Sequence, residues 1–172
     1  MIEPEQNFRT TALVWLQGAC AVTLCILLFV VASSAAEKGK IMSEHVSGTF
    51  DVKVAPVAGT APDAAFGHMS IDKVFHGDLE GTSKGLMLTA GDLKTGEAGY
   101  VAMEKVTGAL KGRVGSFVFM HHATMSGGAV SLTVETVPGS GTDALKGIAG
   151  TMIIRMDGGK HTYDFDYTLP NA

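Results

Sequence analysis

Cysteine is missing from most of this chain. Its two cysteines, Cys20 and Cys25, both lie in an apolar N-terminal segment, and none follows Cys25. A domain built from the later residues therefore has no disulfide, no thiolate nucleophile and no thiolate-ligated zinc. Cysteine content consequently gives no information about the redox compartment.

Basic residues are also scarce, and the formal net charge is −4. The charges of the first 41 residues cancel, because Arg9, Lys38 and Lys40 oppose Glu3, Glu5 and Glu37. The acidic balance therefore belongs to the residues that follow. Nucleic-acid binding needs a basic face, so nucleic acid is not an expected partner.

Helical patterning is almost absent after Met42, where one short stretch, Asp143–Lys146, could form a single turn. Apolar and polar residues alternate instead, which is typical of half-buried strands. Eight such segments are separated by glycine-containing turns: 46–54, 69–75, 80–90, 99–110, 113–125, 129–137, 151–156 and 161–169. Short hairpin connections favour an all-β domain over residues 42–172, an eight-stranded antiparallel β-barrel whose closure leaves no free edge.

The N-terminal segment allows three interpretations. Residues 11–36 are uncharged and exceed the roughly 20 needed for a helix to span a bilayer, which predicts a transmembrane anchor over residues 1–41. Small residues before Glu37 would alternatively suit signal cleavage near Ala36, giving an exported protein. Translation starting at Met42 would instead leave the domain cytoplasmic. Lysines after the segment and Arg9 before it do not settle membrane orientation.

The strand patterns predict which faces are buried. In the last strand Tyr163, Phe165, Tyr167 and Leu169 share one face, opposite two aspartates and a threonine, so the aromatic face should lie inside. The strand 113–125 is apolar on both faces, and a barrel interior covers only one. A second subunit would cover the other face most simply, so we expect a homo-oligomer, in its simplest form a dimer.

Three runs carry a family resemblance: 74–82 (VFHGDLEGT), 115–121 (GSFVFMH) and 137–150 (VPGSGTDALKGIAG). Together they resemble the bacterial family called domain of unknown function 3224, from about Glu44 to Leu169. The third run is also similar to the glycine-rich signature of allene oxide cyclases and dirigent proteins. The resemblance implies an allene oxide cyclase-like barrel, usually oligomeric, but no reaction. This chain departs from the family's pattern in two ways. Met120 stands where a glutamine is usual, and the apolar N-terminal segment is itself unusual for the family.

Candidate polar groups lie on several strands. His121 and His122 are adjacent, so at most one of them can face the interior. An interior carboxylate beside His121 would make a proton-transfer pair. Glu104 and Glu80 are the carboxylates proposed for the pocket, and Glu135 is a further strand carboxylate. The sequence leaves open which of these three carboxylates and two histidines face the interior. The proposed ligand-pocket residues are His121, Glu104, Glu80, Phe117, Phe119, Tyr163, Phe165 and Tyr167.

Several familiar chemistries have no motif here. The Gly139–Thr142 run lacks the Gly-Lys-Ser/Thr and the following helix of a phosphate-binding loop. No G-x-S-x-G elbow occurs, and no histidine and glutamate have metal-motif spacing, so we expect neither a metal site nor a cofactor. The run 139–142 is expected to let the chain turn and close one barrel end under Leu145 and Ile148.

Three functions remain open from the sequence. The first is a barrel that binds a small apolar molecule. The second is a cofactor-free isomerase or cyclase, which a buried carboxylate with a raised pKa would favour. The third is an oligomeric structural barrel with a filled interior and no ligand. Barrel size allows all three, because eight strands enclose either a packed core or one small ligand.

Overall fold

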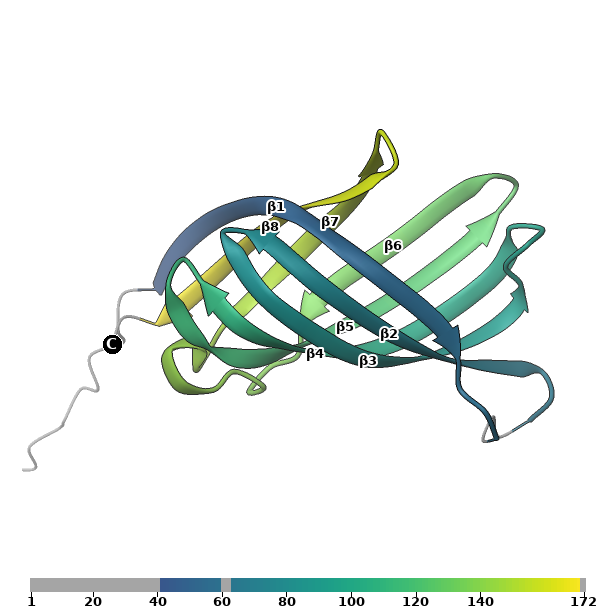
Figure 1. Cartoon of the computed structure of the whole chain (residues 1–172), viewed down its shortest axis with the longest axis horizontal. Helices are drawn as coiled ribbons and strands as arrows, with labels where there is room; N and C mark the ends of the chain where they lie inside the picture. The colour runs from purple at the N-terminus through teal and green to yellow at the C-terminus, as the bar shows by residue number, and fades with distance from the viewer. Residues whose placement is uncertain (1–40, 60–62, 171–172) are drawn as a thin grey trace, which may run out of the picture. The chain divides into compact units, whose positions relative to one another are not determined.

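The computed structural model describes residues 41–59 and 63–170, without the side chains of residues 41, 42 and 157. Eight strands form a closed antiparallel barrel in which each strand pairs with its sequence neighbours and β1 pairs with β8 (Figure 1). The strands are β1 (Ile41–Pro56), β2 (Phe66–Gly77), β3 (Leu79–Asp92), β4 (Glu97–Leu110), β5 (Arg113–Ser126), β6 (Ala129–Thr136), β7 (Ala149–Asp157) and β8 (Lys160–Pro170). The prediction of an eight-stranded antiparallel barrel is confirmed.

Most strands run slightly longer than the alternation predicted, because pairing continues into the residues that flank the alternating segments, whereas β6 ends one residue earlier than predicted, at Thr136. β1 already pairs with β8 at Ile41. The tight turns after β5 and β7 each contain two glycines with positive φ, at 127–128 and 158–159. Glycine is the residue that adopts this backbone conformation without steric cost.

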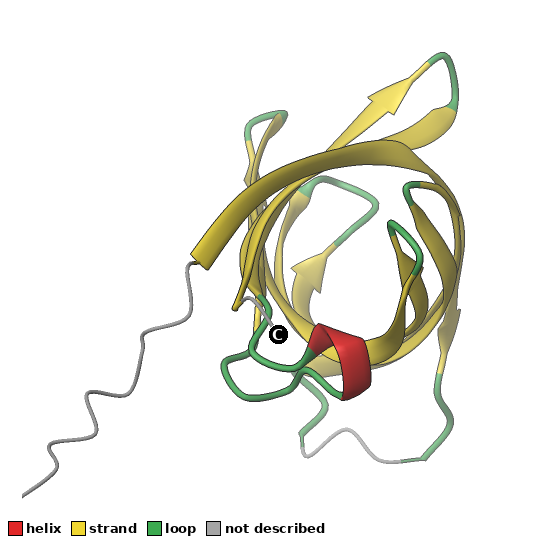
Figure 2. Ribbon diagram, turned by 90° about the vertical axis from the view of Figure 1, so that its left-hand side faces the viewer, coloured by secondary structure: helices red, strands yellow, loops and turns green. Residues whose placement is uncertain are grey.

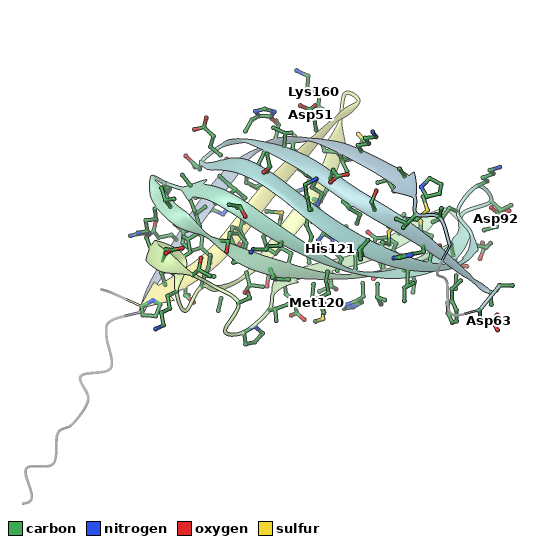
Figure 3. The ribbon with its side chains drawn as sticks, turned by 60° about the horizontal axis from the view of Figure 1, so that its bottom comes forward. Asp51, Asp63, Asp92, Met120, His121 and Lys160 are labelled. Carbon is green, nitrogen blue, oxygen red and sulfur yellow. The ribbon has the colours of Figure 1, made fainter. Side chains whose placement is uncertain are left out.

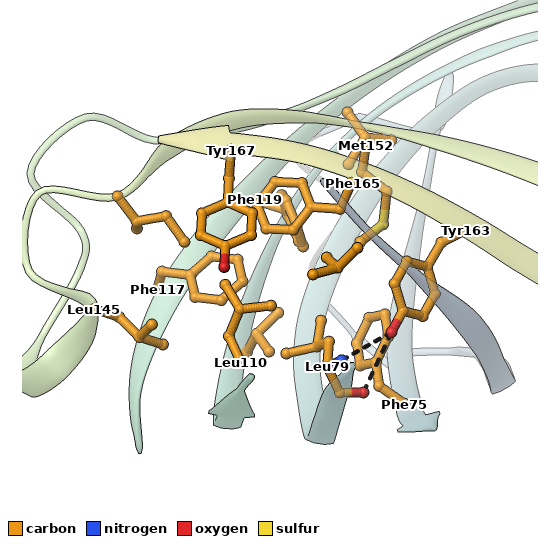
Figure 4. Packing of buried hydrophobic residues seen from close by; sticks show 14 of the residues in the cluster. Phe75, Leu79, Leu110, Phe117, Phe119, Leu145, Met152, Tyr163, Phe165 and Tyr167 are labelled. Atoms are coloured by element: carbon orange, nitrogen blue, oxygen red, sulfur yellow. Dashed lines mark hydrogen bonds between the residues drawn. The ribbon is translucent and has the colours of Figure 1, made fainter. Parts of the chain in front are cut away.

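An aromatic core fills the end of the barrel where β1 begins and β8 ends (Figure 4). Phe165 packs against Phe117, Phe119 and Tyr167, with ring centroids 5.2 to 5.9 Å apart. The hydroxyl of Tyr163 accepts a hydrogen bond from the Leu79 backbone N–H at 3.0 Å. The inward placement of the aromatic face of β8 is confirmed.

A loop and a 3₁₀ turn, η1 (Asp143–Leu145), cap this end of the barrel (Figure 2). Leu145 and Ile148 are fully buried beneath the cap. The glycine-rich run also pairs with the start of β5, because the Ser140 hydroxyl accepts from Val118 N–H and the Thr142 N–H donates to the Ser116 carbonyl. The run therefore closes the barrel end, as its glycines predicted. We call this end the capped end.

The barrel wall has a seam between β6 and β7. These strands pair only where Glu135 lies opposite Thr151, whereas β6 pairs with β5 over residues 129–136 and β7 pairs with β8 over residues 149–157. Figure 1 shows the two ribbons splaying apart beyond that point. The edges that face the seam are therefore left without a neighbouring strand.

The predicted N-terminal anchor or signal lies outside the described residues. Within residues 41–59 and 63–170, no helix has the length and apolarity to cross a bilayer.

Candidate functional site

A charged layer crosses the middle of the barrel. Lys73 Nζ donates a hydrogen bond to Glu104 Oε2 at 2.8 Å, and the Ser83 hydroxyl donates to Glu104 Oε1. His121 Nε2 also lies 2.8 Å from Glu104 Oε2, but without the angle of a hydrogen bond, so Nε2 has no hydrogen-bond partner among the described residues. Glu104 is 0% exposed, His121 2% and Lys73 6%. These four residues are called the charged layer below.

Strand register brings the four side chains together. Lys73 lies opposite Ser83 on neighbouring strands, and His121 lies one inward position along β5 from Phe119, the partner of Glu104. Gly85 lies directly opposite Glu104 on β3. A Cβ added at Gly85 would come within 3.1 Å of Glu104 Cβ and 2.6 Å of the Met103 carbonyl oxygen. The absence of a side chain at Gly85 therefore leaves the space that Glu104 occupies.

The charged layer rests on the aromatic core. Lys73 Nζ lies 4.7 Å from the centre of the Phe50 ring and 5.7 Å from that of Phe75. These distances are within the range of a cation–π interaction. Two ring faces and one carboxylate thus compensate a buried ammonium that would otherwise be costly to desolvate.

Glu104 is held in its ionised form. Burial alone would raise the pKa of Glu104, but the contact with His121 and the charge of Lys73 outweigh burial and lower the pKa to about 2. A carboxylate with so low a pKa is a weak proton acceptor near neutral pH. Glu104 is therefore suited to fixing positive charge and poorly suited to abstracting a proton.

The opposite end of the barrel is open. Val54, Val130 and Met156 face inward by strand alternation, yet they are 46%, 66% and 61% exposed. Further inward-facing residues between them and the charged layer are only partly buried: Val52, Met69, Tyr100, Leu132 and Ile154. The open end therefore presents an apolar inner wall above the charged layer.

A second polar cluster lies at the capped end. Glu44 accepts hydrogen bonds from Arg113 at 2.7 Å and from the Tyr167 hydroxyl at 2.9 Å. Hydrogen bonding to Arg113 and Tyr167 lowers the pKa of Glu44, while burial and Glu44 raise the pKa of Tyr167 to about 12. These contacts join β1, β5 and β8 where the barrel closes, so the cluster is structural.

The outer wall carries an apolar patch over β3, β4 and β5. Its members pair across the strands, Leu88 with Val101 and Leu86 with Met103, which in turn lies opposite Met120. They border a groove of about 670 Å³ that His68 and His122 also line. Figure 3 shows Met120 on the outside of the wall and His121 within. We call Leu86, Leu88, Val101, Met103 and Met120 the outer patch.

The comparisons with known proteins identify the family. The family described as a protein of unknown function (DUF3224) matches residues 46–167. The chain belongs to the DUF3224 family. A crystal structure of a DUF3224 protein of unknown function from Shewanella oneidensis MR-1 is 42% identical, with a TM-score of 0.70. The alignment covers 76% of this chain and all of that one. Among curated proteins, none matches this chain.

The structure places the sequence-proposed pocket residues of this DUF3224 chain in three environments. His121 and Glu104 lie together in the charged layer. Five aromatic residues pack within the core at the capped end and do not border the open end: Phe117, Phe119, Tyr163, Phe165 and Tyr167. Glu80 was proposed as a pocket residue, but its side chain points away from the interior and is exposed. His122 and Glu135 also point outward, by alternation with His121 and Val134.

Sequence reasoning missed Lys73 and Ser83 as functional candidates. The alternation of β2 did carry a signal, because Lys73 shares its face with Met69, Ile71 and Phe75. A lysine on an otherwise apolar face needs a buried partner, and the carboxylate of Glu104 is that partner. Ser83 gave no comparable signal, since serine is tolerated on either face of a strand.

Proposed function

We propose that this protein is a binding barrel that holds a small apolar molecule in its open half, above the charged layer. One observation carries the proposal: inward-facing apolar side chains at the open end remain exposed, while the capped end is packed with aromatic rings. Binding sites combine apolar walls with a few polar groups that fix orientation. The open half supplies the walls, and the charged layer supplies the polar groups.

The alternative of an isomerase receives less support. The resemblance of the 137–150 run to allene oxide cyclases favours it, and such an enzyme would act mainly by positioning its substrate. However, the lowered pKa of Glu104 is the opposite of what a general base requires. The proposal therefore covers binding and no reaction.

Titration with an uncharged apolar fluorophore, N-phenyl-1-naphthylamine, tests the proposal. The full chain should bind the probe, and Leu132→Trp should weaken binding by about tenfold or more because the larger side chain fills the open half. Val101→Trp adds the same side chain to the outer patch and should leave binding unchanged. Loss of binding in Val101→Trp alone would place the probe on the outer patch and contradict the proposal.

A further inference from the structure

The groups that face the open half are predominantly basic. Among the described residues, the ionisable side chains directed inward from the charged layer to the open end are Lys73, Glu104, His121, His161 and Tyr100. Three of these can carry positive charge, and Glu104 is the one carboxylate. Burial raises the pKa of Tyr100, which keeps its hydroxyl neutral near neutral pH.

The carboxylate of Glu104 has little capacity left for a ligand. Ser83 donates to Oε1, and Lys73 donates to Oε2, which His121 also approaches. Donors, in contrast, remain available. Glu104 accepts one hydrogen bond from the Lys73 ammonium, which has three N–H groups and otherwise lies over the Phe50 and Phe75 rings. His121 Nε2 has no hydrogen-bond partner among the residues described, and its charged neighbour is Glu104 Oε2 at 2.8 Å. A ligand group that accepts hydrogen bonds would therefore be satisfied here, and a donor would not.

Two of the inward-facing neighbours of His121 are small, buried alanines. Ala102 lies opposite His121 on β4, and Ala123 is the next inward residue of β5 toward the open end. On the other side His121 pairs with Val134, beyond which Leu132 is only partly buried. Leu132, on the β6 side of His121, is therefore the least buried of these neighbours.

We propose that the ligand is a monoanion, an apolar molecule with one carboxylate-like group that sits against His121 and Lys73. This inference rests on the binding function proposed above and adds the charge of the ligand. The layer places two basic side chains, Lys73 and His121, beside the single carboxylate of Glu104. The ligand's oxygens would accept from His121 Nε2, which makes no hydrogen bond among the described residues, and charge-assisted hydrogen bonds are stronger than neutral ones.

Displacement of the bound naphthylamine by decanoate and by decanol tests the charge of the ligand, because the two differ only in the head group. Both are used with the full chain below micelle-forming concentrations. Decanoate should displace the probe at about tenfold lower concentration than decanol. His121→Gln should abolish the difference, and His122→Gln, which changes the neighbouring outward histidine, should leave it unchanged.

Each other outcome has a distinct meaning. Equal displacement by decanoate and decanol would overturn the monoanion while leaving apolar binding intact, whereas no probe binding at all would overturn the proposed function itself. A decanoate preference that persists in His121→Gln would place the anion elsewhere and overturn the inference. If His121→Gln does not fold, His121→Asn places a smaller neutral side chain at the same position, and the preference should again be lost. A preference that survives in a folded His121→Asn variant would contradict the assignment.

Discussion

At the scale of single residues, Lys73 and Glu104 depend on each other. Both are buried and joined at 2.8 Å. Lys73→Met should lower the free energy of unfolding by about 3–5 kcal/mol, because it leaves Glu104 as an uncompensated buried charge. Replacing both residues, by Met and Leu, should recover most of that loss. Urea unfolding measures both effects, and a single variant as stable as the parent would contradict this account of the pair.

Acid should weaken the barrel through Glu104. Its pKa is about 2 in the folded protein and near 4.5 in an unfolded chain, so its stabilising contribution is complete above pH 4.5. The contribution is lost progressively as the pH falls from 4.5 toward 2, because the folded state then resists a proton that the unfolded state accepts.

Glu104→Gln should therefore flatten the pH dependence of the free energy of unfolding between pH 4.5 and 2. Glu80→Gln removes an exposed carboxylate and serves as the matched control, with a slope close to that of the parent. Urea unfolding at several pH values measures the slopes. Equal flattening by both changes would show that Glu104 is not the dominant group.

The residues of the charged layer were only partly predictable from the sequence. Alternation placed His121 on one face with Phe119 and Glu104 on one face with Val106, but it left open which of these faces lies inside. It could not show that Lys73, 31 positions before Glu104, would meet it, because that depends on strand register and barrel closure. Glu80 shows a second limit. Its strand is interrupted by glycines, so alternation did not indicate whether the Glu80 side chain faces the interior or the outside.

At the scale of elements, the strands and the capping run followed from local pattern, whereas the seam did not. Periodicity identifies β6 and β7 separately but says nothing of how far they pair. The long connection from Thr136 to Ala149 caps the barrel and forms hydrogen bonds with the start of β5. β6 and β7 pair as strands only at Glu135 and Thr151, and the Thr136 hydroxyl adds hydrogen bonds to the Gly150 backbone.

Amide hydrogen exchange tests the seam. Within β6, the amides of residues 129–134 that point toward β5 should be protected, and those that point toward β7 should exchange much faster, because no strand accepts their hydrogen bonds. β4 supplies an internal comparison, since it pairs on both sides along its length. Uniform protection of all β6 amides would mean that β6 and β7 pair more extensively than described.

At the scale of the whole molecule, the outer patch bears on assembly. The sequence predicted that the outward face of β5 needs a cover, and the structure adds β3 and β4 to that face, with Leu86, Val101 and Met103 each about half exposed. We propose that a second copy of the chain covers the outer patch. Contiguous apolar surface of this kind commonly marks an interface between proteins.

Sedimentation at micromolar concentration tests assembly through the outer patch. The parent should sediment as a dimer, and replacing Val101 and Met103 together by Lys should give a monomer, because charge would be desolvated in the interface. Val114→Lys is the control, because Val114 is exposed at the start of β5 and lies outside the patch. A monomeric parent, or a dimer that persists in the double Lys variant, would contradict the proposed interface.

The central claim is that a small molecule occupies the open half of the barrel, and native mass spectrometry tests it most directly. The full chain, purified from the organism that makes it, should carry an organic molecule that is released on denaturation. The Leu132→Trp variant, expressed and purified in the same way, should carry none, while Val101→Trp should still carry it. A parent protein that is bare, or a Leu132→Trp variant that carries the same molecule, would contradict the claim.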